Sequence, residues 1–218
     1  MPAFMMSIAV SSFLQLSAGE ALRAEDQERL RACIAKIETA PEEAYEDGLT
    51  WQGEGNRPEA RHCVALALIE LGRLEEGATR LRELAMATDG GSREARAVYL
   101  AQAGNAWMLS RRPEAAELSL GDAISFTPDD PSLYADRARA RMVQDKLDLA
   151  GKDLDQALAL SGGHLDALKL RIELALRQNR ISDAEADLRT ALKIAPKDID
   201  VLVLRGRVRE AQLPEKDG

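Results

Sequence analysis

Two cysteines and two histidines are the residues of this chain with the most specific chemistry. Cys33 and Cys63 could form a disulfide or bind a metal ion, and His62 or His164 could serve as a metal ligand or a general base. Neither cysteine belongs to a C-x2-C motif, and His62 points to a different face of its expected helix from the adjacent Cys63. The spacing therefore predicts no metal site. His164 follows two glycines in an expected turn, where we expect it to be solvated.

The other polar residues do not form a catalytic set. The sequence suggests no Ser/His/Asp or Cys/His/Asn arrangement, and no glycine-rich phosphate loop precedes an expected helix. Carboxylates such as Glu42, Glu43, Glu46 and Asp47 recur at helical spacing among basic residues, which is typical of a solvated helix face. We therefore expect a non-enzymatic protein with no cofactor and no small-molecule substrate.

Composition narrows the class of partner. The chain has 218 residues, a formal net charge of −8 and only 4% aromatic residues, and it is rich in Ala, Leu, Arg and Glu. That composition favours helices that pack on small side chains. No dense run of Lys or Arg is present, and phosphate binding needs concentrated positive charge, so we expect no nucleic-acid partner.

The segment 1–24 has the character of an export signal. Phe4 to Leu16 (FMMSIAVSSFLQL) is an apolar run too short to span a bilayer but long enough for the apolar region of a signal. Small residues at Ser17, Gly19 and Ala21 match the pattern of a signal-peptidase site. No Lys or Arg precedes the run, which leaves open an apolar helix that caps the fold. We expect a periplasmic protein with no stable membrane span; the alternative is a cytoplasmic one.

Whether the protein is exported affects whether its two cysteines are expected to form a disulfide. Cys33 lies on the apolar face of an expected helix over residues 25–38, and Cys63 lies in a second one over residues 58–71, with a short helix from Pro41 between them. Three helices with short turns bring the first and third side by side, and two cysteines in an exported protein indicate a disulfide. The alternative is a pair of buried thiols that act as small apolar residues.

One 34-residue pattern repeats along residues 97–198. Ala116, Ala150 and Ala184 share this interval, and further positions keep it as well. Such a period is typical of stacked helical repeats, in which no single unit buries its own apolar face. Ser92 is suited to cap the helix that follows it. The sequence predicts these segments: the signal or apolar helix at 1–24, a helical hairpin at 25–57, repeats at 58–91, 97–130, 131–164 and 165–198, a capping helix at 199–211 and a polar tail at 212–218.

The units resemble tetratricopeptide repeats, whose signature is W-x2-L-G-x2-Y, then A-x3-F, then P. Matching residues in the second unit are Gly104, Trp107, Ala116, Leu120, Ala123 and Pro128, and the fourth unit matches at Leu168, Ala184, Leu188, Ala191 and Pro196. Gly77, Arg137, Arg141 and Ile172 depart from the pattern. The resemblance implies an all-α, right-handed α-solenoid of stacked antiparallel helix pairs with an N-terminal helical cap and a C-terminal capping helix, as in a bacterial periplasmic or envelope member of the family.

The resemblance also implies a concave groove, lined by the first helix of each pair, that binds a peptide or partner protein. The corresponding residues of this chain are His62, Leu66, Ile69, Ala101, Asn105, Met108, Ala135, Arg139, Met142, Lys169, Glu173 and Leu176. Alternatively, the apolar members pack beneath the N-terminal helices, and Arg139 pairs with Glu173. A clamp for a C-terminal carboxylate does not fit, because Glu173 would oppose it.

Two functions follow as hypotheses. The first is a periplasmic scaffold that binds another protein in the groove, so that Arg139→Glu or Met142→Glu abolishes binding while the fold is retained. The second is a structural subunit, cytosolic or at the envelope, that forms a homo-oligomer through the apolar N-terminal helix or an end repeat. It predicts an oligomer that dissociates when residues 1–24 are deleted.

Overall fold

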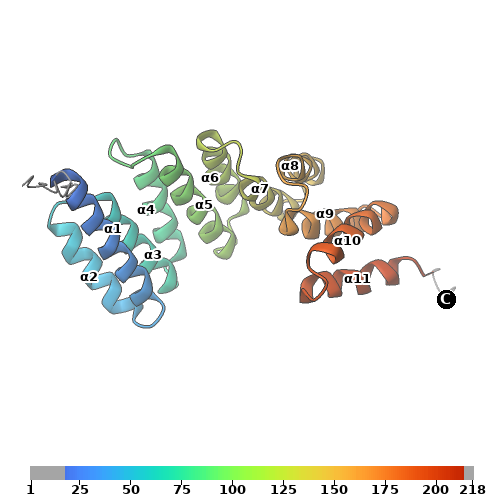
Figure 1. The fold of residues 1–218 in the computed structure, drawn as a ribbon, viewed down its shortest axis with the longest axis horizontal. Coiled ribbons are helices and arrows are strands. Elements are labelled where there is room, and N and C mark those ends of the chain that lie inside the picture. Colours follow the sequence, from blue (N-terminus) through green and yellow to red (C-terminus); the bar gives the residue numbers. More distant parts are fainter. Residues whose placement is uncertain (1–17, 214–218) are drawn as a thin grey trace, which may run out of the picture.

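The computed structural model describes residues 18–213 of the chain, and this part is an elongated stack of helices without a strand (Figure 1). The helices are α1 (Ala18–Ile37), α2 (Pro41–Gly53), α3 (Pro58–Glu70), α4 (Leu74–Met86), α5 (Arg93–Leu109), α6 (Pro113–Phe126), α7 (Pro131–Val143), α8 (Leu147–Leu160), α9 (Leu165–Arg177), α10 (Ile181–Ile194) and α11 (Ile199–Ala211). No helix among these residues is both long and apolar enough to cross a membrane.

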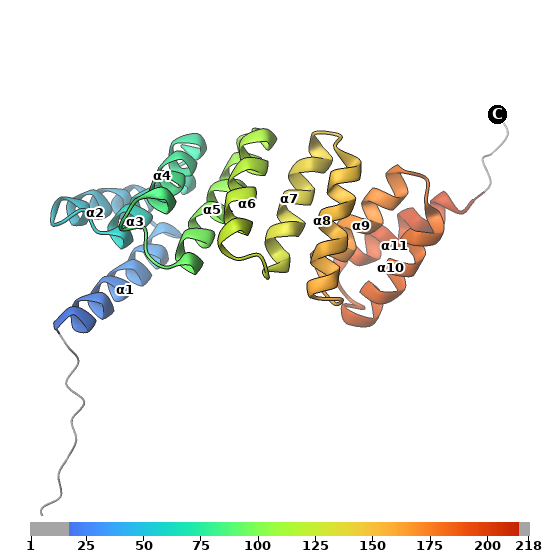
Figure 2. The same cartoon turned by 90° about the horizontal axis from the view of Figure 1, so that it is seen from above.

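Consecutive helices pair side by side along the stack (Figure 2). The pairs α3/α4, α5/α6, α7/α8 and α9/α10 correspond to the four sequence repeats, although α5 begins at Arg93, before the predicted start of its unit at residue 97, and α11 follows as a single helix. The all-α solenoid of stacked helix pairs is therefore confirmed. Helix α1 begins at Ala18 rather than near residue 25, and residues 1–17, which carry most of the expected export signal, lie outside the described residues.

Polar caps and prolines fix where the helices begin. Proline occupies the first turn of α2, α3, α6 and α7, where a missing N–H costs nothing. The Ser92 side chain accepts a hydrogen bond from the Ala95 N–H at the start of α5. His164, which we expected to be solvated, is half-buried, and its Nδ1 accepts from the Ala167 N–H and caps α9. The sequence did not indicate this role, because Asp or Ser is the expected cap and here a histidine in the turn replaces it.

Small residues set the spacing between paired helices. Ala116, Ala150 and Ala184 are each fully buried, as the repeat pattern requires. Gly77, which departs from the pattern, lies where α3 and α4 approach even more closely. A Cβ at Gly77 would lie 2.6 Å from Ile69 Cγ1, so even the alanine found in the other units would clash. The departure therefore reflects a tighter helix contact in the first repeat.

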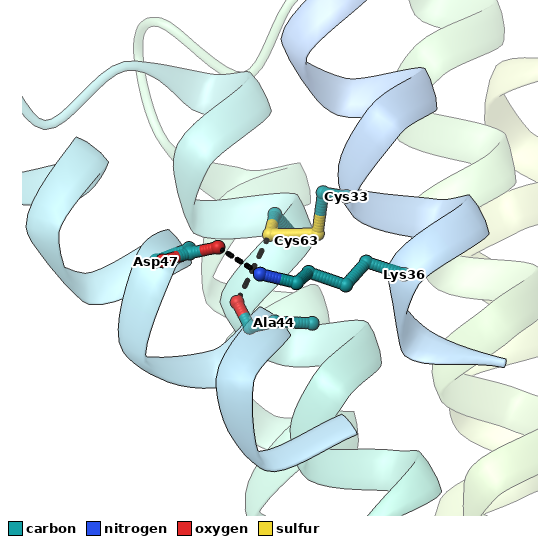
Figure 3. The surroundings of a disulfide bond; sticks show 5 residues. All are labelled: Cys33, Lys36, Ala44, Asp47 and Cys63. Carbon is teal, nitrogen blue, oxygen red and sulfur yellow. Dashed lines mark hydrogen bonds and ion pairs between the residues drawn. A yellow bond between two sulfur atoms is a disulfide. The ribbon is translucent and has the colours of Figure 1, made fainter. Parts of the chain in front are cut away.

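The N-terminal end of the stack is held by a covalent bond. A disulfide joins Cys33 on α1 to Cys63 on α3, with the two Cα atoms 6.0 Å apart (Figure 3). Beside it, Lys36 on α1 donates to Asp47 on α2 at 2.7 Å. Trp51 packs against Cys63 and is 3% exposed. These contacts tie the hairpin α1–α2 to the first repeat.

Candidate partner-binding groove

The first helices of the last three units enclose a hollow on one face of the stack. It has a volume of about 430 Å³, and all of its lining comes from α7, α9 and α11. We call it the C-terminal hollow; its lining residues are Arg139, Met142, Val143, Asp166, Lys169, Leu170, Glu173, Arg177, Asp200, Val203, Leu204 and Arg207. It contains four of the residues expected in the groove, namely Arg139, Met142, Lys169 and Glu173.

The 34-residue register explains why these side chains meet. Lys169 and Val203 occupy the same position of successive first helices, and so do Arg139, Glu173 and Arg207. Stacked helices in the same register present equivalent positions to the same face. The sequence prediction missed Val203 and Arg207 because it ended at the fourth repeat. Extending the same positions by one more period would have found both residues.

Ion pairs cross the C-terminal hollow from helix to helix. Lys169 Nζ lies 3.0 Å from Asp166 on its own helix and 3.2 Å from Asp200 on α11. Partial burial alone would lower the pKa of Lys169, but the hydrogen bonds to both carboxylates outweigh it and raise the pKa. Lys169 is therefore a fixed positive charge that joins α9 to α11.

Arg139 does not pair with Glu173. Its Nη1 donates to Asp136 Oδ1 of the same helix at 2.7 Å, while Glu173 lies 3.6 Å from Arg207 Nη1 on α11. Burial raises the pKa of Asp136 above its usual value despite the nearby Arg139 guanidinium. The C-terminal hollow therefore presents both signs of charge, already partly paired, rather than one concentrated charge.

Apolar side chains provide the remaining surface of the C-terminal hollow. Val143 and Val203 are 61% and 56% exposed and lie on α7 and α11. Met142 is only 4% exposed and belongs to the core formed by α7, α8 and α9. The expectation that Met142→Glu would retain the fold is therefore wrong, because the new carboxylate would have to enter that core.

The N-terminal part of the expected groove is packed instead of hollow. His62 is 6% exposed, its Nε2 lies 2.7 Å from Gln102 Oε1, and its ring meets Tyr99 edge-on. Burial lowers the pKa of His62. Leu66 packs against a cluster that includes Ile37 of α1. The other expected groove residues outside the C-terminal hollow are Ile69, Ala101, Asn105, Met108, Ala135 and Leu176, of which Ala135 is buried and Asn105 exposed.

Two further features limit what the described residues can do chemically. Within residues 18–213, no group of three His, Cys, Asp or Glu side chains is placed to hold a metal ion. A second hollow, of about 580 Å³, lies beside the second helix α4 and includes Glu75, Glu76 and Glu83. Glu75 and Glu76 are already paired, with Arg112 and with Arg73 and Arg80. The C-terminal hollow is the better candidate because it lies on the first helices.

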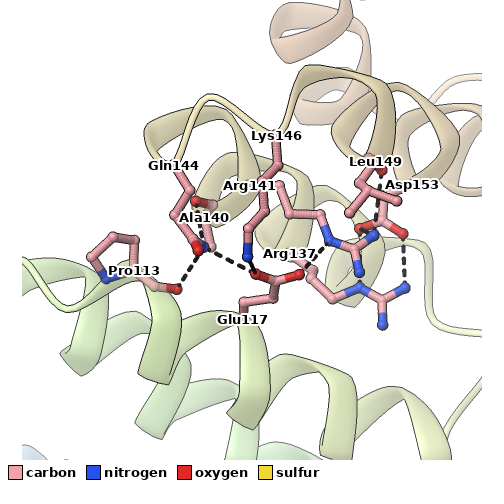
Figure 4. A network of polar contacts seen from close by, with 9 residues as sticks. All are labelled: Pro113, Glu117, Arg137, Ala140, Arg141, Gln144, Lys146, Leu149 and Asp153. Atoms are coloured by element: carbon pink, nitrogen blue, oxygen red, sulfur yellow. Dashed lines mark hydrogen bonds and ion pairs between the residues drawn. The ribbon is translucent and has the colours of Figure 1, made fainter.

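A partly buried polar network, which the sequence did not predict, joins α6, α7 and α8 (Figure 4). Glu117 on α6 accepts from Arg141 at 2.9 Å, Lys146 at 2.7 Å and Gln144 at 3.1 Å. Burial by itself would raise the pKa of Glu117, but these hydrogen bonds lower it to about 2. Arg141 departs from the repeat pattern because it serves this network.

The chain was compared with family models, curated proteins and solved structures. No family model matches the chain. It is 37% identical over 93 residues to tetratricopeptide repeat protein 36 of Mus musculus, which covers 38% of this chain and 50% of the mouse protein. The chain spans about half the length of the curated relatives it matches.

Two solved structures extend the comparison. The thermophilic protein TTC0263 of Thermus thermophilus is 26% identical with a TM-score of 0.59, covering 87% of this chain and 100% of that one. The first tetratricopeptide domain of Spaghetti (RPAP3), bound to the HSP90 peptide SRMEEVD, is 20% identical with a TM-score of 0.53, covering 54% of this chain and 96% of that domain. The chain therefore has the fold of a tetratricopeptide repeat solenoid and is similar in sequence to that family over part of its length.

Proposed function

We propose that this chain is a non-enzymatic interaction scaffold that binds a segment of a partner protein in the C-terminal hollow. The observation that carries the proposal is the hollow itself, with a volume of about 430 Å³ on the first helices of three consecutive units. The exposed Val143 and Val203 offer apolar contact at low desolvation cost. The ion pairs beside them offer donors and acceptors that can be shared with a partner.

The chemistry of the lining indicates the kind of segment that fits. Lys169 is shared by Asp166 and Asp200, and Arg207 faces Glu173, so no basic residue of these two pairs is free for a lone carboxylate. A segment with apolar side chains and both signs of charge is the better match. The RPAP3 domain in complex with an HSP90 peptide is an example of peptide binding on the same fold.

The proposed compartment is oxidising, with the bacterial periplasm as the specific proposal. The Cys33–Cys63 disulfide supports it, because such bonds persist mainly outside reducing compartments. The intact mass of the protein isolated from its native cell without reductant tests this proposal. We expect a mass two hydrogens below that of the dithiol and without residues 1–19 or 1–21. A full-length dithiol protein would contradict the proposal.

Photo-crosslinking in the native cell tests the groove directly. A photoreactive residue replaces Val203, which is 56% exposed in the C-terminal hollow, or Leu149, which is 40% exposed on the second helix α8. We expect a discrete crosslinked partner from position 203 and none from position 149, because only the first lies in the hollow. Lys169→Glu should reduce the yield from position 203. Equal crosslinking from both positions, or a yield that Lys169→Glu leaves unchanged, would contradict the proposal.

A further inference from the structure

The last helix of the stack has one face without a neighbour in residues 18–213. Helix α11 packs Val201, Leu204 and Val208 into a cluster with α9 and α10. On the opposite side Ile199 is 77% exposed, and a Cβ at Gly206 would meet no atom within 4 Å. In every earlier pair, the corresponding face of the first helix is covered by its second helix. We call this uncovered side the open face of α11.

The position of Gly206 in the repeat is occupied by Gly104 in the second unit, where the second helix covers it. Gly104 on α5 precedes Gly206 by three periods of the repeat. A Cβ at Gly104 would lie 2.7 Å from Leu120 Cγ on α6. Gly206 thus occupies a position shaped for a leucine of a second helix, but no such helix is present among the described residues.

Arginines on two of the first helices pair with a carboxylate on the second helix of the same unit. On α7, Arg137 Nη2 and Arg141 Nη1 both donate to the Asp153 carboxylate of α8, at 2.7 Å and 2.8 Å (Figure 4). The Asp153 side chain is only 5% exposed. One unit later, Arg171 on α9 donates from Nε and Nη2 to Asp187 on α10, as Arg137 does to Asp153. A buried aspartate is therefore part of how α8 and α10 pack on the first helix of their own units.

Helix α11 carries the same pair of arginines without the acid. Arg205 and Arg209 lie two periods after Arg137 and Arg141. Within residues 18–213 neither has an ion pair or hydrogen bond from its side chain. Glu185, at the position equivalent to Glu117, accepts from Gln212 instead. Two unpaired guanidinium groups thus lie beside the open position at Gly206.

We propose that the open face of α11 binds an amphipathic helix of another protein that carries an aspartate for Arg205 and Arg209. The model for this helix is α8, in which Asp153 and Leu154 lie between two small residues, Ala150 and Ala157. The bound helix places its leucine over Gly206 and its aspartate between the two arginines. This surface lies outside the C-terminal hollow, so the chain has two binding surfaces of different chemistry.

Charge complementarity selects this occupant over two others. Two copies of α11 face to face would bring Arg205 and Arg209 of one chain against those of the other, which is repulsive. Residues 1–17 contain no Asp or Glu, so they offer no acid to the arginines. A partner helix with the A-x2-D-L-x2-A pattern satisfies both the apolar contact and the charge.

A labelled peptide with the sequence of residues 145–161, which spans α8, is the probe for this surface. Fluorescence anisotropy would measure its binding to the full chain, and CD would verify that each protein variant is folded. We expect saturable binding that R205E/R209E weakens by at least about tenfold. The charge-reversed peptide with Asp153→Arg should regain affinity for R205E/R209E.

Matched controls separate this surface from others. The peptide with Asp155→Asn should bind as the parent peptide does, because Asp155 pairs with the following first helix and not with α7. Arg139→Glu in the C-terminal hollow should also leave binding unchanged, which keeps this proposal independent of the groove. Sedimentation equilibrium should show a monomer.

The proposal fails under three outcomes. Binding that is absent, or that R205E/R209E leaves unchanged, removes the open face as the site. A homodimer that R205E/R209E dissociates assigns the face to a second copy of the chain. Peptide binding that appears only after residues 1–17 are deleted assigns it to that segment.

Discussion

The two ends of this helical stack differ in how their terminal faces are covered. At the N-terminal end, the hairpin α1–α2 packs on α3 and the Cys33–Cys63 disulfide fixes it there. At the C-terminal end, α11 leaves Gly206 uncovered and two arginines without partners among the described residues. A repeat stack must cover or solubilise its terminal faces. The N-terminal end is therefore covalently fixed, and the C-terminal end is the one that we propose to bind a partner.

The same contrast runs along the face formed by the first helices. In the N-terminal half, His62 and Leu66 are packed among neighbouring side chains. In the C-terminal half, Val143 and Val203 remain exposed around the C-terminal hollow. This contrast supports the proposal that a partner binds in the second half of the stack.

The strongest test of this division separates core from lining within α7. Met142→Glu should lower the free energy of unfolding by more than about 3 kcal/mol, because it forces a carboxylate into a packed core. Arg139→Glu, on the same helix, should cost about 1 kcal/mol or less, because Arg139 makes only a partly exposed ion pair. Urea unfolding followed by CD measures both. Equal losses would contradict the assignment of Met142 to the core; Met142→Leu is the control for size.

Removing the disulfide should weaken the N-terminal end. The double variant C33A/C63A should lose about 3 kcal/mol of unfolding free energy, since the bond closes a loop between residues 30 apart in sequence. Fluorescence of Trp51, which packs against Cys63, reports on this end when Trp107 is replaced by Phe in both proteins. Reductant should destabilise the parent protein and leave the double variant unchanged. An equal response of both proteins to reductant would contradict the role of the bond.

The Glu117 network links the two halves of the stack and should depend on pH. Glu117→Gln should lower the free energy of unfolding by about 1–2 kcal/mol at pH 7. The full pKa shift corresponds to a larger free energy, but the site is partly solvated, which weakens the effect of the charge. The folded pKa lies below the unfolded one, so the wild type's advantage is complete above about pH 5. It should disappear as the pH falls through about 2.

Chemical unfolding of wild type and variant across this pH range measures the effect. Glu83→Gln is the matched control, because Glu83 is an exposed glutamate within α4 that accepts no side-chain hydrogen bond in the described structure. A Glu117→Gln cost that stays constant down to pH 2 would show that the carboxylate charge is not responsible.

A last test replaces glycine by alanine at a closed and at an open helix contact. Gly206→Ala should stabilise the protein by about 0.5–1 kcal/mol, because alanine favours a helix and its Cβ meets nothing. Gly77→Ala should destabilise it by about 1–3 kcal/mol, because its Cβ would lie 2.7 Å from the Ala65 carbonyl oxygen. Thermal unfolding measures both. Changes of the same sign would contradict the contrast between the two positions.

The fold was predictable from the sequence because the repeat interval, the helix caps and the order of the helices all indicate the same stack. Alanines such as Ala116 and Ala150 recur at the repeat interval, and they are fully buried as a close helix contact requires. Ser92 was predicted as a helix cap and is one. The proximity of Cys33 and Cys63 also followed, since a short helix between two others places those two side by side.

The site was predictable only in part, because the period fixes position and not pairing. Lys169 and Glu173, which the period assigns to the groove, both line the C-terminal hollow. The period could not show that Arg139 pairs with Asp136 on its own helix, since side-chain choice depends on local distances. The burial of Met142 also depends on how closely α8 and α9 pack, which no single helix pattern states.

The most direct test of the central claim is hydrogen exchange of the chain, measured by mass spectrometry with and without the partner that crosslinks at Val203. We predict that the partner slows amide exchange in α7, α9 and α11, and leaves α3 and α5 unchanged. That result would place binding in the C-terminal half of the stack. Slower exchange confined to α3 and α5 would contradict the account.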